Sequence, residues 1–229
     1  MRLVEKYRPR RLSDVVGQDK AIARLRDYMD DMGGRVWLFV GPSGTGKTTT
    51  TFCLANELGI MAEGETLQSI KKGRNLDFNF WAGSAMDKNA AAELADWAGY
   101  LPMRAPIKMA IIDEAQNITP GGRESLLSIF EGLTDNIVVV MTTTGLRTIA
   151  KQNDLFAVPK NDPFGSRCKH VHFVDPPAEA IIDHLVEIAF KETGNGAGLP
   201  YKEILEEGKG SIRACIDLLE DALKQLKRR

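Results

Sequence analysis

The sequence predicts an α/β fold with a parallel sheet, followed by a small all-helical lid domain. Short apolar segments alternate with helical patterns as far as residue 174, which is typical of parallel strands covered on both faces by helices. A glycine-rich loop follows the first of these segments, at a point where a strand would lead into a helix. Beyond Pro176-Pro177 only helical patterns remain. We therefore expect a core over 1–174 and a lid over 175–229.

The expected strands and helices alternate along the core. Residues 36–40, 109–112 and 137–141 are continuously apolar, 76–81 alternates as a strand can, and 170–174 is a short final strand. Helical patterns lie at 20–29, 48–58, 89–101 and 123–131, and after the prolines at 178–191, 201–206 and 211–226. Strands that alternate with helices imply a parallel sheet with right-handed crossovers. In such sheets ligands bind beyond the carboxyl ends of the strands.

The loop from Gly41 to Thr48 has the pattern G-x-x-x-x-G-K-[ST] of phosphate-binding loops. Its glycines let backbone N–H groups turn around phosphates, and the next helix adds the positive end of its dipole. We expect Lys47 to reach the β- and γ-phosphates and the Thr48 hydroxyl to bind Mg²⁺. The core is thus predicted to be a P-loop NTPase core that binds a nucleoside triphosphate. The predicted contact residues here are Gly41, Pro42, Ser43, Gly44, Thr45, Gly46, Lys47, Thr48 and Thr49.

Two carboxylates follow the apolar segment 109–112 directly. Asp113 and Glu114 would lie at the carboxyl end of a buried strand, where Asp113 can hold the metal and Glu114 can orient an attacking water. The competing interpretation is that both residues cap the next helix. The phosphate loop upstream favours the catalytic interpretation.

Three threonines, Thr142 to Thr144, end the next predicted strand. At least one hydroxyl can point at the γ-phosphate, and we favour Thr143 for this role. The alternative, that β-branched threonines simply fill a strand end, is nearly as well supported.

Composition excludes several other classes of protein. Charged residues make up 27% of the chain and leave a formal net charge of -1, which gives no general argument for binding nucleic acid. The three cysteines form no C-x-x-C pair, so neither a zinc knuckle nor a disulfide framework is encoded. No apolar run approaches the ~20 residues that span a bilayer. We expect a cytoplasmic protein with no membrane partner.

Further motifs resemble those of the clamp-loader AAA+ ATPases, the family of the replication factor C small subunits and the bacterial gamma/tau subunit. The matching motifs cover nearly the whole chain, and the K-Y-R-P opening and the S-R-C triplet are the most specific of them. They are Glu5-Lys6-Tyr7-Arg8-Pro9, Asp14-Val15-Val16-Gly17-Gln18, the phosphate loop, Asp113-Glu114-Ala115, 119–132, Ser166-Arg167-Cys168 and Gly210-Ser211-Ile212-Arg213.

The resemblance implies roles for residues outside the phosphate loop. Arg167 corresponds to an arginine finger that acts on the ATP of a neighbouring subunit, and Arg213 to a second sensor arginine that reaches the phosphates from the lid. The adenine side of the pocket would be walled by residues of the N-terminal segment, which could also simply pack on the core. These residues are Val4, Tyr7, Arg8, Pro9, Val15 and Val16.

The chain also departs from the family pattern. Family members of this kind usually carry a third, C-terminal helical collar domain, whereas this sequence stops at Arg229 just after the lid, and the zinc module of the bacterial subunit is absent. The stretch 145–165 is longer than the family implies, and we expect it at a subunit or partner surface. Family DNA contacts come from basic side chains and backbone amides on core helices, but 89–101 is acidic and apolar here.

The resemblance implies an ATP- and Mg²⁺-dependent subunit of a ring of AAA+ subunits that opens or loads a sliding clamp on primer-template DNA. The alternative is an adaptor-like AAA+ switch that recruits or remodels a helicase or another replication or repair factor. Glu114 and Arg167 favour hydrolytic competence.

Overall fold

The computed structural model describes residues 1–29, 35–61, 65–66, 69–70, 75–144, 167–196 and 198–226. The stretch 145–165, for which the sequence predicts a partner surface, lies outside the described residues.

The core is a parallel sheet of five strands in the order β2-β3-β4-β1-β5, which confirms the predicted fold class. The strands are β1 (Arg35–Val40), β2 (Phe78–Ala82), β3 (Lys108–Asp113), β4 (Ile137–Thr143) and β5 (Cys168–His172). β5 begins and ends two residues earlier than the sequence predicts, because Val36 to Val40 of β1 pair with Cys168 to His172. The carboxyl ends of β1, β3 and β4 meet at one edge of the sheet.

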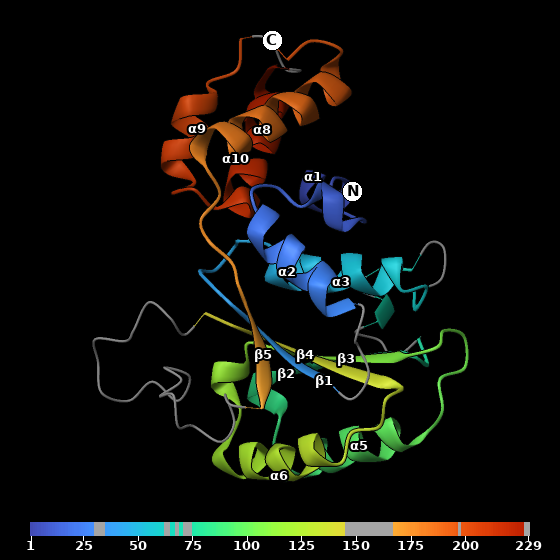
Figure 1. The fold of residues 1–229 in the computed structure, drawn as a ribbon. Helices are drawn as coiled ribbons and strands as arrows, with labels where there is room; N and C mark the ends of the chain where they lie inside the picture. Colours follow the sequence, from blue (N-terminus) through green and yellow to red (C-terminus); the bar gives the residue numbers. More distant parts are fainter. Residues whose placement is uncertain are drawn as a thin grey trace.

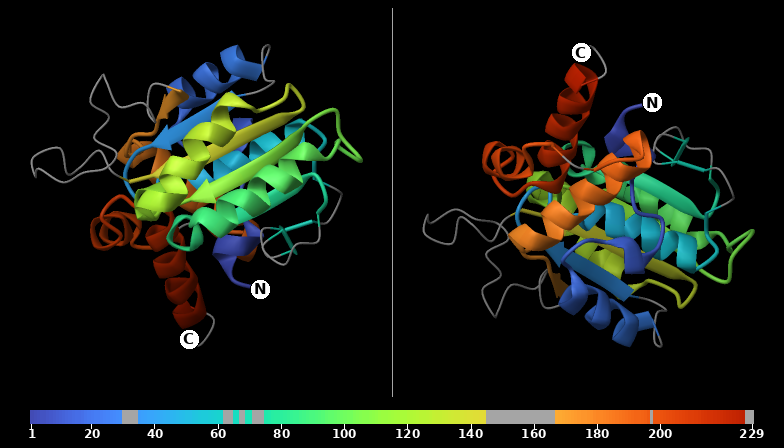
Figure 2. Two further views of the ribbon diagram at one scale, coloured as in Figure 1. Left: turned by 90° about the horizontal axis from the view of Figure 1, so that it is seen from below. Right: turned by 90° about the horizontal axis from the view of Figure 1, so that it is seen from above.

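Helices cover both faces of the sheet (Figures 1 and 2). Helices α2 (Asp19–Met29) and α3 (Lys47–Glu57) lie on one face, and α5 (Lys88–Gly99) and α6 (Pro120–Glu131) lie on the other. Alternation along β1 divides its side chains between two apolar cores. Trp37 and Phe39 pack towards α2 and α3, whereas Leu38 and Val40 pack towards α5 and α6. Short 3₁₀ turns occur at η1 (Leu12–Asp14), η2 (Gly83–Ala85) and η3 (Ala115–Asn117).

The remaining helices form a separate cluster at one end of the molecule (Figure 1). This cluster contains α8 (Ala178–Thr193), α9 (Tyr201–Glu207) and α10 (Ile212–Leu226). The N-terminal helix α1 (Leu3–Lys6) packs with them, since Leu3 is buried in the same apolar cluster. Packing therefore groups the first residues with the lid, whereas the division expected from chain order places them in the core.

Polar contacts also attach α1 to the lid. Arg2 pairs with Asp217 at 2.7 Å, and the backbone N–H of Leu3 donates to Glu220 Oε2 at 2.8 Å. The Tyr7 hydroxyl donates to Glu192 Oε1 at 2.8 Å. Burial is the largest cause of the raised pKa of the Tyr7 phenol, and the bond to Glu192 adds to it.

Two connections join the helical cluster to the sheet, and they touch each other. Gln18 is buried and bonds the backbone of Val174 at both ends, because its Nε2 donates to Val174 O at 2.8 Å and its Oε1 accepts from Val174 N at 3.2 Å. Gly17 has a φ of +67°, and a Cβ there would lie 2.7 Å from Cβ of Pro176. A glycine is therefore required where the two connections meet.

None of the helices in the described ranges combines the length and the apolar character that crossing a bilayer requires.

Candidate nucleotide-binding site

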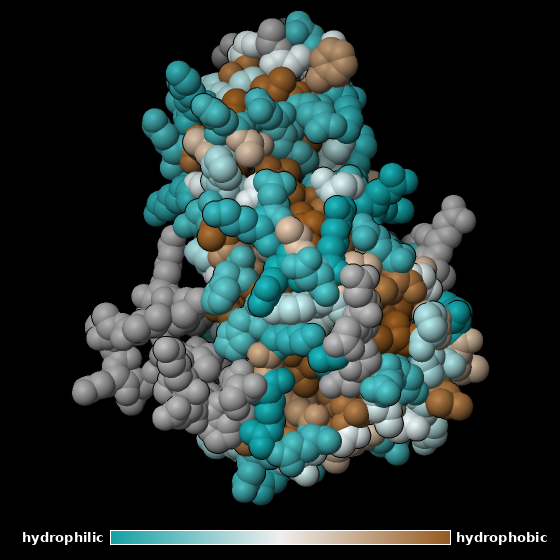
Figure 3. Space-filling view, in the orientation of Figure 1, coloured by the Kyte–Doolittle hydropathy of each residue, from teal (hydrophilic) through white to brown (hydrophobic). Residues whose placement is uncertain are grey.

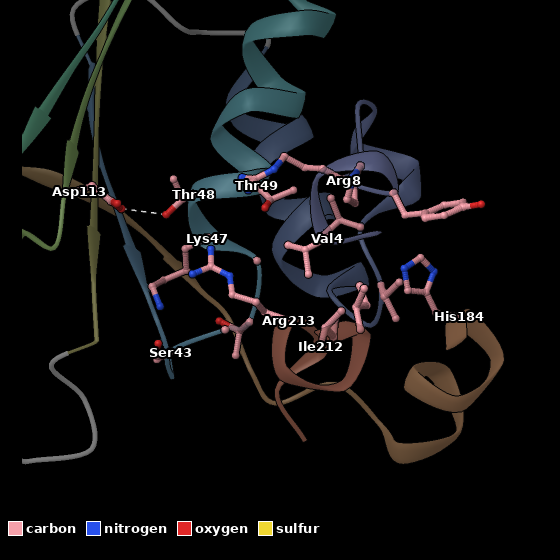
Figure 4. Close-up of a pocket in the computed structure, with 18 of the residues that line it drawn as sticks. Val4, Arg8, Ser43, Lys47, Thr48, Thr49, Asp113, His184, Ile212 and Arg213 are labelled. Atoms are coloured by element: carbon pink, nitrogen blue, oxygen red, sulfur yellow. Dashed lines mark hydrogen bonds between the residues drawn. The ribbon is translucent and has the colours of Figure 1, made fainter. Parts of the chain in front are cut away.

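A pocket lies where the carboxyl end of the sheet meets the helical cluster (Figure 4). Its wall combines the phosphate loop, the end of β3, the N-terminal segment and two lid helices. The lining residues are Val4, Tyr7, Arg8, Pro9, Val15, Val16, Ser43, Gly44, Thr45, Gly46, Lys47, Thr48, Thr49, Asp113, Glu114, His184, Ile212, Arg213 and Ile216. Most residues that the sequence singles out are thus brought together, although Gly41, Pro42, Thr143 and Arg167 are not among the lining residues.

The phosphate loop is held in a tight curve between β1 and α3. Gly44 and Gly46 have φ angles of +81° and +95°, which an L side chain rarely adopts. The Thr45 hydroxyl donates to Pro42 O at 2.9 Å, and Lys47 Nζ donates to Gly41 O at 2.8 Å and to Pro42 O at 2.7 Å. The lysine ammonium thus sits inside the curve of the loop, where the pattern predicts phosphate oxygens.

Burial lowers the pKa of Lys47, and the nearby Glu114 and Asp113 carboxylates oppose that shift. Burial of the ammonium favours an anionic ligand beside the lysine, because an added negative charge would stabilise the charged form of a desolvated ammonium.

Asp113 connects the phosphate loop to two strands. Its Oδ1 accepts from the Thr48 hydroxyl at 2.8 Å and from the Thr142 hydroxyl at 2.7 Å. A hydroxyl and a carboxylate oxygen side by side at a phosphate loop fit Mg²⁺, which takes one or two protein oxygens and several from its nucleotide. The described residues hold no group of three or more His, Cys, Asp or Glu side chains able to bind a metal, and a magnesium site of this kind needs none.

Glu114 follows Asp113 in a left-handed conformation, with φ 57° and ψ 52°. Such a conformation costs ~1–3 kcal/mol for a residue with a side chain and persists only where the surroundings impose it. Here the backbone N–H of Glu114 donates to Thr142 Oγ1 at 3.1 Å. Its carbonyl oxygen accepts from Asn117 N at 2.9 Å. Glu114 is among the residues that line the pocket.

The threonines at the end of β4 point in alternating directions. Thr142 contacts Asp113, and Thr144 accepts a hydrogen bond from Gln116 Nε2 at 3.1 Å. Thr143, which the sequence analysis favours, is fully buried, and β4 pairs it with Val40 of β1. Side chains alternate along a strand, so Thr142 and Thr144 share the face opposite to Thr143. The structure thus turns Thr142 and Thr144, rather than Thr143, towards the pair of carboxylates.

Arg213 enters the pocket from the second residue of α10. Figure 4 shows its guanidinium directed at Lys47 and the phosphate loop. The lid also touches the loop directly, because a Cβ at Gly44 would lie 2.5 Å from Ser211 Oγ. A glycine at position 44 therefore serves both the loop conformation and the approach of the lid.

Three lid residues that line the pocket were not predicted from the sequence as site residues. Ile212 and Ile216 lie one turn apart on α10, and His184 lies on α8 at the end of the pocket away from Lys47 (Figure 4). Burial is the main cause of the lowered pKa of His184, so its imidazole is neutral at neutral pH. The four-residue spacing of Ile212 and Ile216 beside Arg213 is the one sequence signal that could have identified these two isoleucines.

All six predicted residues of the N-terminal segment line the pocket, but this wall is not purely apolar. Arg8 donates from Nη2 to Glu5 Oε1 at 2.9 Å. Its Nε and Nη1 are buried and have no hydrogen-bond partner among the residues that the structure describes. Buried donors without acceptors are costly, so this wall offers donors to a polar ligand as well as apolar contacts.

Arg167 lies at the amino end of the parallel strands, whereas the phosphate loop lies at their carboxyl end. It precedes Cys168, which pairs with Val36 at the start of β1, whereas the loop follows Val40 at the end of β1. Four residue steps along a strand span ~13 Å. The Arg167 guanidinium is partly exposed and pairs with Glu131. Arg167 therefore lies well away from the pocket of its own chain.

Comparison with known proteins relates this chain to one protein family and to several curated relatives. Residues 17–158 match the family described as DNA polymerase III, delta subunit. The chain is 28% identical over 219 residues to the replication factor C small subunit of Methanothermobacter thermautotrophicus, covering 96% of this chain and 62% of that protein. It is 31% identical over 224 residues to the replication factor C small subunit of Archaeoglobus fulgidus, covering 96% of this chain and 63% of that protein. The chain thus spans less than two thirds of the length of these relatives.

Solved structures support the fold alone. A RuvB mutant from Thermotoga maritima superposes with a TM-score of 0.68 at 18% sequence identity, covering 97% of this chain and 68% of that one.

Proposed function

Because the chain belongs to the DNA polymerase III delta subunit family, within the clamp-loader AAA+ ATPases, we propose that it binds and hydrolyses ATP with Mg²⁺ to open or load a sliding clamp on primed DNA. The observation that carries this proposal is the composition of the pocket. The phosphate loop, both carboxylates of β3 and a lid arginine line one pocket, and these parts are the ones that phosphoryl transfer from ATP requires.

Each part has a distinct role in the proposed reaction. The loop amides, Lys47 and Arg213 bind the phosphates. Thr48 and Asp113 would hold Mg²⁺, which would supply positive charge beside the phosphate oxygens. Glu114 orients the attacking water. Arg167 supplies the finger to the site of an adjacent subunit, so the isolated chain would turn over slowly.

We propose that an exposed apolar surface beside β2 and α5 binds the sliding clamp. We call it the apolar patch and define it as Leu76, Tyr100, Leu101 and Met103, whose exposed fractions are 53%, 63%, 78% and 73%. Large exposed apolar side chains gathered in one place mark protein interaction sites. Figure 3 shows apolar surface on the side of the molecule where Figure 1 places the connection between α5 and β3.

The connection that carries this patch is held in one conformation. Asp77 is fully buried and accepts from the backbone N–H groups of Met103 at 2.8 Å, Arg104 at 2.6 Å and Ala105 at 3.3 Å. Lys108 Nζ is held under the same connection by Trp97 O at 2.5 Å and Tyr100 O at 3.1 Å. A surface prepared in this way loses little conformational entropy when a partner binds.

The remaining partners in the proposal are other AAA+ subunits, arranged in a ring, and primer-template DNA. The position of Arg167 supports the ring, because the arginine is partly exposed and lies at the other end of the strands from its own phosphate loop. DNA binding would show as an affinity that falls with added salt, since phosphate contacts release counterions.

Native mass measurement of the assembly formed with a non-hydrolysable ATP analogue and Mg²⁺ tests the proposal. We expect a ring that contains other AAA+ subunits and a sliding clamp. The double variant Leu101→Ser with Met103→Ser should no longer bind the clamp, whereas the exposed control Leu226→Ser should still bind it. Glu114→Gln should keep ATP binding and slow hydrolysis ~100-fold. A monomer, or a closed ring with a helicase, would contradict clamp loading and support the adaptor-like switch instead.

A further inference from the structure

The side chain of Gln116 lies between the proposed catalytic carboxylate and the end of β4. Its Nε2 donates to Glu114 Oε2 and, at 3.1 Å, to Thr144 Oγ1. Its Oε1 accepts from Thr144 N at 3.4 Å. One amide thus contacts Glu114 on one side and both the backbone and the hydroxyl of Thr144 on the other.

These contacts permit only one orientation of the amide. A carboxylate is purely an acceptor, so it requires the NH₂ group to face Glu114, and the backbone N–H of Thr144 requires the carbonyl oxygen. Exchanging the two ends would place an oxygen against the carboxylate and an NH₂ group against an N–H. Both hydrogens of the NH₂ group are used in the observed orientation.

The rest of Glu114 is already fixed by other groups. Its backbone is held by Thr142 and Asn117. A Cβ on Gly83 would lie 2.2 Å from Glu114 O, so the turn after β2 closes tightly against this bend. Only the side-chain torsions of Glu114 are left, and among the described residues the hydrogen bond from Gln116 is the one made to its carboxylate.

We propose that Gln116 is a positioning residue: its amide holds the Glu114 carboxylate in the orientation from which it acts, and Thr144 fixes that amide. This inference rests on the proposed ATPase function. The orientation of Glu114 then depends on the end of β4, from which the chain continues towards Arg167.

The test uses the assembled complex and the near-isosteric variants Gln116→Leu and Thr144→Val. Misplacing a catalytic group by about 1 Å can cost ~100-fold, so we expect kcat for ATP to fall ~10–100-fold in Gln116→Leu. The Kd for ATP should change less than about twofold, because Gln116 is not among the residues that line the pocket. Gln225→Leu, the same substitution at an exposed glutamine near the end of α10, is the matched control and should retain normal kcat.

Two further results separate positioning from a merely structural role. The effects of Gln116→Leu and Thr144→Val should be non-additive, because both act on one chain of contacts, and Thr144→Ser should restore turnover. Normal kcat in Gln116→Leu, or equal losses in kcat and ATP affinity, would overturn the inference.

Crystal structures of the wild-type and Gln116→Leu proteins test the inference without relying on turnover. A Glu114 carboxylate that rotates in the variant supports it, and an unchanged orientation overturns it. If the wild-type complex hydrolyses no ATP, the proposed function fails, and this comparison still decides whether Gln116 orients Glu114.

Discussion

Asp77→Asn tests how the protein builds the connection that carries the apolar patch. The substitution keeps the shape of the side chain but replaces one acceptor oxygen with an NH₂ donor. Asp77 Oδ2 accepts from Arg104 N and Ala105 N, and Oδ1 accepts from Met103 N. An asparagine loses least when its oxygen takes the position of Oδ2, which leaves the NH₂ group facing the N–H of Met103.

The expected cost follows from these contacts. One hydrogen bond to a charged acceptor is lost, a backbone donor is left unsatisfied, and the two remaining bonds lose their charge assistance. Burial lowers the pKa of the nearby Lys108, and Asp77 opposes that shift, so removing the negative charge also removes support for the buried ammonium. We expect the free energy of unfolding to fall by ~2–4 kcal/mol.

Urea unfolding and hydrogen exchange measure this effect. The amides of Met103 to Ala105 should exchange faster in Asp77→Asn, and the affinity for the sliding clamp should fall, whereas the exposed control Asp96→Asn should change neither. A loss of stability below about 0.5 kcal/mol, with protection of the three amides unchanged, would refute the view that Asp77 organises the connection.

Three more predictions concern the pocket, the neighbouring subunit and the core. Gly44→Val places a side chain against Ser211 at a backbone φ of +81°. Titration with a fluorescent ATP analogue should therefore show at least ~10-fold weaker binding. An affinity equal to that of the wild-type protein would contradict the contact between the lid and Gly44. Arg167→Ala should leave the ATP affinity of the isolated chain unchanged but lower ATP turnover by the assembly ~1,000-fold or more. An equal loss of turnover in the isolated chain would contradict action on a neighbouring subunit. Burial raises the pKa of the Cys53 thiol from 9.0 to about 12. Because the unfolded thiol ionises first, the free energy of unfolding should fall by up to ~1.4 kcal/mol per pH unit as pH rises from about 9 towards about 12. Unfolding titrations of Cys53→Ala should lack this contribution, and an identical slope in both proteins would contradict it.

Local patterns in the sequence were sufficient to predict the sheet and the phosphate loop. Continuous apolar runs marked β1, β3 and β4, because strands covered on both faces need apolar side chains throughout. The loop pattern located the pocket, because its glycines and lysine are close together in sequence. The predicted roles of Arg167, Arg213 and the N-terminal residues came from resemblance, and they stay predictions until measured.

Features that depend on distant parts of the chain were not predictable in the same way. Helix α1 has only four residues, and the partners that bind it, Asp217 and Glu220, lie more than 200 positions away. The choice among Thr142, Thr143 and Thr144 depended on which face of β4 turns towards Asp113, and three identical residues carry no information about that. Gln116 was missed because its role arises from contacts across two strand ends rather than from a motif.

The contact between the two connections that join the lid to the sheet determines how the lid can turn. The lid is attached to the core at two points, because helix α1 is joined to the lid at the other end of the chain. Two separate attachment points would resist rotation, but here Gly17 lies against Pro176 and Gln18 bonds both backbone groups of Val174. Because the two attachment points are adjacent, the lid can rotate relative to the sheet about one axis that passes through them. Rotation about that axis would carry Arg213 together with Val4 and Tyr7, which pack with the lid, whereas Val15 packs in the core and would stay with the sheet.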